Sequence, residues 1–201
     1  HKWLLVTCFG YLGYKNARFG RIEAHESVTA YGRECLLRAK EIAEKCGFRV
    51  LHANVDSLWV QKRGTKRKEY DALMEEITRV TQIPIALEGI YRWVAFLPSR
   101  QDERMSVANR YIGVFEDGEI KVRGIEARRR DTPPFVVAAQ MEMLKVLARA
   151  VSQNELTALV QGVIEVACSC ADALRSGQVP YQDLVITKRL SRDPMAYSKD
   201  T

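Results

Sequence analysis

The segment Asn54-Val55-Asp56-Ser57 contains the carboxylate of this chain that is best placed for chemistry. Residues that favour extended structure lie on both sides of it, at Val50-Leu51 and at Leu58-Trp59-Val60. Asn tolerates the left-handed backbone that a two-residue hairpin turn requires, so the pattern predicts a hairpin that turns at Asn54-Val55. The hairpin places Asp56 at the rim of a sheet.

Two interpretations of Asp56 follow from the residues alone. For an arbitrary hairpin, a single carboxylate at the turn is usually a solvated polar residue. It is also a suitable ligand for a hard cation, because proteins often hold Mg²⁺ with only one or two carboxylates plus the phosphates of a substrate. The local sequence leaves both interpretations open.

Basic residues form a second group with possible chemistry. Arg123-Gly124 and Arg128-Arg129-Arg130 lie at the end of a predicted strand, and Asn109-Arg110-Tyr111 lies on the strand before it. Guanidinium groups match the geometry of phosphates, and neutralising phosphates releases counterions. The alternative is a solvated charged turn, and the composition favours neither. The basic loop at 62–68 is interpreted as an exposed loop, with contact to DNA as the second possibility.

The elements that must position these residues follow from periodicity and turn signals. Helices are expected at 2–9, 27–46, 67–81, 135–150 and 153–175, and strands at 49–62 (the hairpin), 85–97, 110–115, 119–126 and 183–187, with 17–24 a further extended candidate. Thr132-Pro133-Pro134 marks a boundary, because two prolines cannot continue a strand ladder. The order of elements predicts an α+β fold, with a sheet domain up to residue 131 and a helical region beyond it.

Composition narrows the class of protein. The chain has 201 residues, a net charge of +6 and 47% hydrophobic residues, which suffices for a core in one or two domains. We expect no membrane span, because no apolar run reaches the roughly 20 residues that a bilayer requires, and we find no signal peptide. The five cysteines form no zinc-ligand spacing, so we expect a reduced cytoplasmic protein in which Cys35 and Cys46 are core residues. Residues 3–6 are apolar and follow directly after His1-Lys2, and both ends are interpreted as cut from something larger.

Several motifs resemble the palm of archaeal family B DNA polymerases, and they occur along the chain in the family's order. Phe9-Gly10, with Lys2 before it, looks like the end of the fingers motif Lys-x-x-x-Asn-Ser-x-Tyr-Gly. Asn54-Val55-Asp56-Ser57 stands where the family has Asp-Thr-Asp-Ser or Asp-Thr-Asp-Gly. Glu88-Gly89-Ile90-Tyr91 is similar to its Glu-Gly-Phe-Tyr.

The remaining matches extend the resemblance over nearly the whole chain. Residues 24–34 resemble the helix that follows the fingers motif, and Arg110-Tyr111 falls in a Lys-x-Tyr segment. The run from Arg123 to Asp131 resembles Arg-Gly-Leu-Glu…Arg-Arg-Asp, and residues 183–188 resemble an element of the thumb.

The resemblance implies a fold and an activity. It implies the C-terminal half of a palm at 1–131, with the end of a fingers helix at 1–10, and a thumb base at 132–201: an antiparallel palm sheet with packed helices, followed by a helical thumb base. The implied activity is template-directed transfer of a nucleotide from dNTP to a primer 3′-OH at a two-metal Mg²⁺ site shared with a partner chain.

The resemblance also implies roles for individual residues. Asp56 is the implied metal ligand, and Glu88 is an implied catalytic carboxylate near the metals. Lys2 and Phe9 are implied to contact the nucleotide. The implied DNA-binding residues are Arg110, Tyr111, Arg123, Gly124, Arg129 and Arg130.

The chain departs from the family pattern at several positions. Asn54 replaces the first Asp of its motif, Val6-Thr7 replaces Asn-Ser, Phe9 lacks a hydroxyl, and Asn109 replaces a Lys. The first palm motif, with its own catalytic Asp, and the exonuclease carboxylates have no match in the sequence. The chain therefore resembles either a fragment of a single-chain enzyme or the small subunit of a split polymerase. In the second case, the implied partner is a large polymerase subunit that carries exonuclease, fingers and first palm motif. Primer–template DNA and dNTP are the implied ligands, and no membrane is expected.

An alternative function from a different class stays open on these residues. The chain would then be a catalytically inactive relative that serves as a DNA-binding or assembly scaffold. Under either function we expect a cytoplasmic, nucleoid-associated protein.

Overall fold

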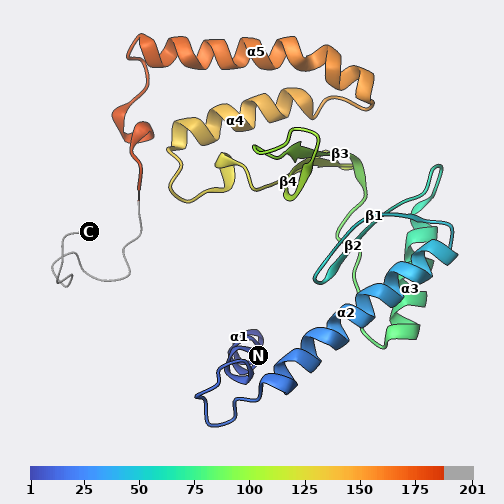
Figure 1. Ribbon diagram of the computed structural model, residues 1–201. Coiled ribbons are helices and arrows are strands. Elements are labelled where there is room, and N and C mark those ends of the chain that lie inside the picture. Colours follow the sequence, from blue (N-terminus) through green and yellow to red (C-terminus); the bar gives the residue numbers. More distant parts are fainter. Residues whose placement is uncertain (188–201) are drawn as a thin grey trace. The chain divides into compact units, whose positions relative to one another are not determined.

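The computed structural model describes residues 1–187 and divides the chain into two compact units, His1–Glu88 and Gly89–Thr201 (Figure 1). Helices and antiparallel strands occur in both units, which confirms the predicted α+β class. The strands form two separate sheets, a two-stranded one in the first unit and a three-stranded one in the second. The division predicted after residue 131 falls inside the second unit, just before a helix that begins at Pro134.

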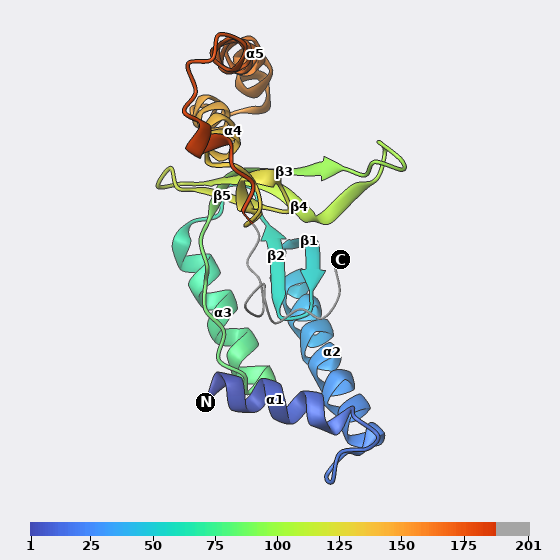
Figure 2. The same cartoon turned by 90° about the vertical axis from the view of Figure 1, so that its left-hand side faces the viewer.

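The first unit is built around a long helix. Its elements are α1 (Lys2–Leu12), α2 (Ile22–Lys45), β1 (Arg49–Asn54), β2 (Ser57–Gln61) and α3 (Arg67–Thr81). The second half of α2 packs against α3 and against both strands of the hairpin (Figure 2). Buried apolar side chains at this junction form the core: Ala39, Ile42, Ala43, Phe48, Leu73 and Ile77.

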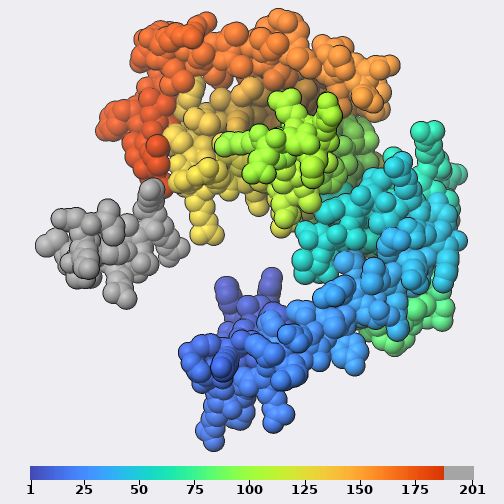
Figure 3. Space-filling model, in the orientation of Figure 1, coloured from blue at the N-terminus to red at the C-terminus, as the bar shows by residue number. Residues whose placement is uncertain are grey.

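The first half of α2 lies outside this core. Two of its apolar residues, Val28 and Tyr31, are 50% and 74% exposed. Helix α1 lies against this part of α2 and forms a projecting group of side chains (Figure 3). The structure describes α1 throughout, and no residue of α1 is buried.

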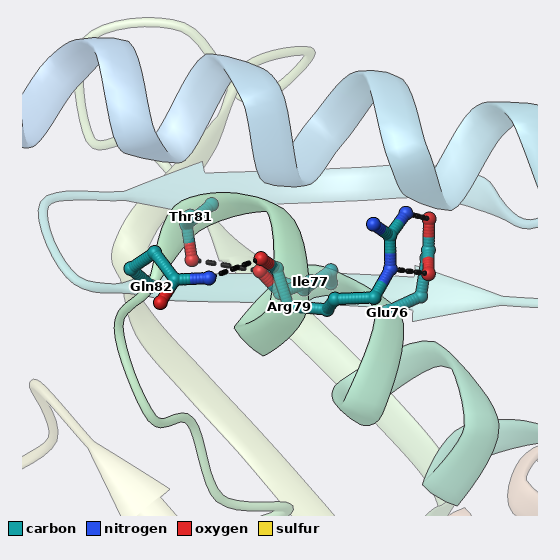
Figure 4. Close-up of polar contacts among 5 residues, drawn as sticks. All are labelled: Glu76, Ile77, Arg79, Thr81 and Gln82. Atoms are coloured by element: carbon teal, nitrogen blue, oxygen red, sulfur yellow. Dashed lines mark hydrogen bonds and ion pairs between the residues drawn. The ribbon is translucent and has the colours of Figure 1, made fainter.

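Polar contacts close the C-terminal end of α3 (Figure 4). Gln82 adopts the left-handed conformation with φ 57°, and its side-chain amide donates to the carbonyl of Arg79 at 2.6 Å. The hydroxyl of Thr81 donates to the carbonyl of Ile77 at 2.7 Å. The Gln82 donor satisfies one of the carbonyls that the last helical turn leaves without partners, whereas the Thr81 hydroxyl bonds back to a carbonyl four residues earlier in the helix. The chain then continues through residues 83–90, which have no regular structure, into the second unit.

The second unit combines a sheet with two helices. Its strands β3 (Tyr91–Pro98), β4 (Ser106–Phe115) and β5 (Ile120–Arg123) form an antiparallel sheet with β4 in the centre. The short helix η1 (Glu126–Arg128), α4 (Pro134–Leu147), α5 (Gln153–Arg175) and the short helix η2 (Tyr181–Leu184) follow. The indole of Trp93 on β3 donates to the carbonyl of Ala150 at 3.1 Å, which ties the sheet to the loop after α4.

Some local expectations are wrong. Residues 17–20 form turns rather than a strand, and residues 181–184 form a 3₁₀ helix where a last strand was expected. The strand expected from residue 85 begins only at Tyr91. Cys46 is exposed rather than a core residue, because it lies just beyond the end of α2.

The expectation of no long apolar run also needs correction. Helix α5 is long and apolar enough to cross a membrane by length and composition, and it is the single such helix in the described part of the chain. All of α5 is described, and it has no buried residue. One helix of this kind is weak support for a membrane span, and α5 packs along α4 (Figure 1).

Candidate functional site

The hairpin carries Asp56 inside its turn. Asn54 pairs with Ser57 in the β1–β2 register, so Val55 and Asp56 are the two turn residues. The turn therefore lies one residue later than predicted. Asp56 is exposed, and the hydroxyl of Ser57 donates to the carbonyl of Asn54 at 3.1 Å across the turn. The ladder on both sides fixes the backbone from which the Asp56 side chain projects.

Val55 has an unfavourable conformation for its residue type. Its φ is +47°, in the left-handed region that a β-branched side chain rarely adopts. The side chain is also 81% exposed, so core packing does not compensate for the steric cost. Strained backbone next to a candidate ligand is typical of functional sites, where the surrounding structure maintains it.

Asp56 offers one carboxylate rather than a complete cation site. Within residues 1–187, no group of three or more His, Cys, Asp or Glu side chains is arranged to hold a metal ion. Glu88 is exposed at the end of the first unit. The residue after it, Gly89, has no room for a side chain, because a Cβ there would collide with the ring of Phe115. Any metal site that uses Asp56 therefore needs ligands from other molecules or other chain segments.

The two residues expected to contact a nucleotide lie on α1. Lys2 is exposed at the first helical position. Phe9 is half-buried, and its ring stacks on that of His25 in α2 with centroids 4.1 Å apart and an interplanar angle of 25°. His25 Nδ1 also lies 3.1 Å from the carbonyl oxygen of Phe9. Sequence reasoning missed His25, because a single His in a helical run carries no signal of a contact with residue 9.

Part of the expected basic surface is assembled at the joint between β4 and β5. Tyr111 pairs with Arg123 in the register, and the Arg110 guanidinium donates to the carbonyl of Gly124 at 3.2 Å. Gly124 has φ +67°, and a Cβ there would collide with the carbonyl of Asn109. The close approach of the two strands therefore depends on glycine and places Arg110 against Gly124, whereas Arg123 lies opposite Tyr111 rather than Arg110.

Tyr111 does not share this exposed surface. The residue is 3% exposed, and its ring packs against Phe96 with centroids 5.6 Å apart. The structure thus gives Tyr111 a place in the core of the second unit. A direct contact of its ring with DNA is not favoured by this burial.

The next two arginines differ from each other. Arg129 donates two hydrogen bonds to Asp131, at 3.0 and 2.8 Å, and this contact raises the pKa of the guanidinium. Its side chain is 63% exposed, and solvent and salt screen exposed ion pairs, so the pair is a weak restraint. Arg130 is exposed. This geometry favours a role for Arg129 as a brace within its own loop.

A hydrogen-bond network anchors the segment that carries these arginines. The side-chain amide of Gln140 on α4 donates to the carboxylate of Glu126 at 3.1 Å, and its oxygen accepts from the backbone of Ala127 at 2.6 Å. The Thr132 hydroxyl donates to the carbonyl of Glu126 at 2.7 Å. Hydrogen bonds from its own backbone N–H and from Gln140 lower the pKa of Glu126, so the carboxylate supports the fold above its unfolded pKa and loses that effect as the pH falls through its folded pKa.

The basic loop at 62–68 has a partly structural role. Lys62 Nζ lies 2.6 Å from the Glu69 carboxylate and 5.0 Å from the centre of the Phe48 ring. It also donates to the carbonyl of Cys46 at 3.3 Å. Lys62 thus braces the hairpin against the ends of α2 and α3.

Comparisons with known proteins give matches over nearly the whole chain. The profile of DNA polymerase family B matches residues 4–201. The DNA polymerase of Archaeoglobus fulgidus is 29% identical over 98% of this chain, and DNA polymerase 2 of Aeropyrum pernix is 31% identical over 98%. The solved family B DNA polymerase of Pyrobaculum calidifontis superposes with a TM-score of 0.62 at 26% identity over 98% of this chain. This chain spans only 22% or 23% of the length of each of these three proteins.

The joint at Gly124 generates a prediction about stability. Gly124→Ala should lower the free energy of unfolding more than Gly118→Ala, by at least about 1 kcal/mol, because it adds a collision to the left-handed strain. Gly118 is a matched control in the same sheet: its φ is +91°, and no atom of the described residues lies within 4 Å of a Cβ built there. Urea unfolding of the two variants measures the difference. Equal destabilisation would show that the close approach of β4 and β5 is not maintained in solution.

Proposed function

Because this chain belongs to the family B DNA polymerases, we propose that it supplies the second palm carboxylate and part of the duplex-binding surface of a template-directed DNA polymerase. The observation that carries the proposal is the geometry of Asp56. This carboxylate is exposed inside a tight hairpin turn, and a strand ladder on each side holds its backbone. A carboxylate presented in this way is suited to binding a cation together with ligands from outside the hairpin.

The chemistry of the proposed reaction explains why a single carboxylate is useful. Two divalent metal ions, when bound, clamp the attacking and leaving oxygens of an in-line displacement. Mg²⁺ commonly takes only one or two protein carboxylates, because water and substrate phosphates complete its coordination. Asp56 would provide one such ligand, and Glu88 would be a nearby carboxylate. On the same proposal, Lys2 provides a cation for the triphosphate, and Phe9 lies beside the incoming base.

Binding to the duplex would use the joint between β4 and β5. A polymerase copies any template, so its grip on DNA must depend on the backbone and groove shape rather than on base identity. Arg110 lies at this joint against the carbonyl of Gly124, Arg123 stands opposite Tyr111 at the end of β5, and Arg130 is exposed in the following segment. Guanidinium groups suit phosphate contacts.

We further propose that the active enzyme includes a large subunit with the exonuclease, the fingers and the first palm motif. Support comes from the incomplete metal site around Asp56 and from the surface of α1. The side chains of Trp3, Leu5 and Val6 are 83%, 70% and 53% exposed, although they are apolar. Exposed apolar groups of this kind mark a surface that a partner covers. A permanent interface between subunits typically buries roughly 2,000 Å² or more.

The first prediction from this proposed function concerns the isolated chain. It should extend no primer in the presence of Mg²⁺ and dNTP, since Asp56 lacks the other ligands of a two-metal site. It should also self-associate through α1, and Leu5→Lys should reduce that association. Primer extension and light scattering measure the two effects. Unaided extension by a monodisperse monomer would contradict the need for a large subunit.

The second prediction concerns Asp56 in the completed polymerase. Asp56→Asn should reduce turnover by roughly a thousandfold or more, because metal ligation contributes several kcal/mol to the transition state and each 1.4 kcal/mol is tenfold in rate. Affinity for the duplex should stay within about twofold, since phosphate contacts provide it. Asp117→Asn is a matched control, because Asp117 is an exposed carboxylate in the turn before Gly118. Single-turnover incorporation and DNA titration separate the two effects.

The same experiment tests the alternative function. Near-normal turnover with Asp56→Asn would show that Asp56 has no catalytic role. A wild-type complex that binds DNA without any incorporation would favour a scaffold role. Asn54→Asp, which restores the family pattern, should have a far milder effect than Asp56→Asn.

The third prediction distinguishes Arg130 from Arg129. If Arg130 contacts one phosphate, Arg130→Ala should weaken binding equally for all sequences and reduce the slope of log affinity against log salt by about one. Arg129→Ala should change the slope less, because Asp131 already binds this guanidinium. Arg79→Ala on α3, where Glu76 pairs with Arg79, is the control. An unchanged slope with Arg130→Ala would show that Arg130 does not contact a phosphate.

A further inference from the structure

We propose that His25 is a positioning residue, which fixes the ring of Phe9 and the C-terminal turn of α1 for the incoming nucleotide. The inference rests on the proposed function, in which Phe9 lies beside the base. His25 itself touches Phe9 rather than the nucleotide. Its role would be to set where the Phe9 ring lies before a nucleotide binds.

Two different contacts join His25 to Phe9. The imidazole stacks on the phenyl ring, with centroids 4.1 Å apart and planes inclined by 25°. Nδ1 of the same imidazole lies 3.1 Å from the carbonyl oxygen of Phe9. A stack alone lets a ring slide in its own plane, and a hydrogen bond alone lets it rotate. Together they restrain both the side chain and the backbone of Phe9.

The hydrogen bond meets a need of the helix end. Helix α1 ends at Leu12, so the carbonyls of its last turn, Phe9 among them, lie where intrahelical donors run out. The backbone N–H of Gly13 donates to the carbonyl of Tyr11 rather than to that of Phe9. A His side chain near a helix C-terminus is a suitable donor to such a carbonyl. Both the neutral Nδ1–H form and the imidazolium can donate here.

Gly13 provides the space that His25 occupies. A Cβ built at Gly13 would lie 3.0 Å from His25 Nδ1 and 3.1 Å from Cε1. The backbone of Gly13 is ordinary, with φ −79°, so its conformation does not require glycine. The imidazole is therefore what crowds a Cβ at position 13, and a side chain there would require the ring to shift by a few tenths of an ångström.

Few other contacts hold α1 in place. No residue of this fully described helix is buried, and its first turns expose Trp3, Leu4 and Leu5 to 83%, 64% and 70%. A backbone hydrogen bond from Arg21 to the carbonyl of Leu12, 3.0 Å long, closes the turn between the helices. His25 adds a side-chain contact one helical turn further along α2. Loss of the His25 contact should therefore increase the mobility of α1, while the core around Ala43 stays intact.

The position of His25 on α2 links two parts of the proposed site. The second half of the same helix packs against the hairpin that carries Asp56. Through His25, the helix that buries the hairpin also holds the helix that carries Phe9 and Lys2. A rigid α2 then transmits a fixed geometry within the first unit.

The test uses two variants and two readouts. His25→Ala should speed hydrogen exchange of the amides in the last turn of α1 by roughly fivefold or more in the chain itself. In the completed polymerase, it should raise KM for dNTP by roughly fivefold and leave kcat within about twofold, the pattern of a lost binding contact. Ser27→Ala is the control, because the Ser27 hydroxyl donates within α2 to the carbonyl of Glu23 at 2.7 Å. It should change neither quantity.

Gly13→Ala perturbs the same contact, because the added methyl group crowds the His25 ring. It should speed exchange in α1 by pushing the imidazole, and it should have little further effect when His25 is already Ala. Such non-additivity in a double-mutant cycle identifies a direct coupling between the two positions. Additive effects would overturn the assignment, and so would unchanged exchange in His25→Ala. Faster exchange with an unchanged KM would overturn the nucleotide role of His25.

These outcomes separate the inference from the proposed function. If the wild-type complex incorporates no nucleotide at all, the proposed function fails. The exchange measurements on the chain alone still decide whether His25 holds α1.

Discussion

The packing of the second half of α2 against α3 and the hairpin is the contact on which the first unit depends. Ala43 is fully buried there, and Ile77 from α3 is 3% exposed. The small side chain of Ala43 allows α2 to approach the other elements closely, and Phe48 adds a large apolar surface just beyond the end of α2. Close packing of this kind resists local rearrangement. The hairpin can therefore present a polar turn to solvent without losing its own geometry.

The elements with strong periodicity were predictable from the sequence. The helices at 67–81 and 153–175 have the predicted bounds, because apolar spacing and end signals agree in both. The prediction was wrong where local pattern competes with tertiary contacts. Residues 183–187 have the composition of a strand, but in the described part of the chain no neighbouring strand pairs with them. The hairpin turn shifted by one residue because the ladder places Asn54 opposite Ser57, at the cost of a left-handed Val55.

Much less of the candidate site was predictable. The residue types at Asp56 and Arg123 were sufficient to identify candidates, and the strand register then placed Arg123 opposite Tyr111 on β4. The burial of Tyr111 was not foreseeable, because Asn109-Arg110-Tyr111 is consistent with either face of an edge or central strand. His25 lies 16 positions from Phe9 in the chain, and no periodic pattern relates them. Contacts across such separations depend on how the turn between two helices folds.

The left-handed Val55 has a consequence for how stability is distributed in this fold. Glycine at position 55 would relieve the steric cost of the turn, but it would also let the turn visit backbone angles that valine excludes. The carboxylate next to it would then point in more directions. A substitution that relieves the backbone strain at this turn would thus let the Asp56 side chain occupy a wider range of positions. Resistance to unfolding and precision at Asp56 are opposing demands on one residue.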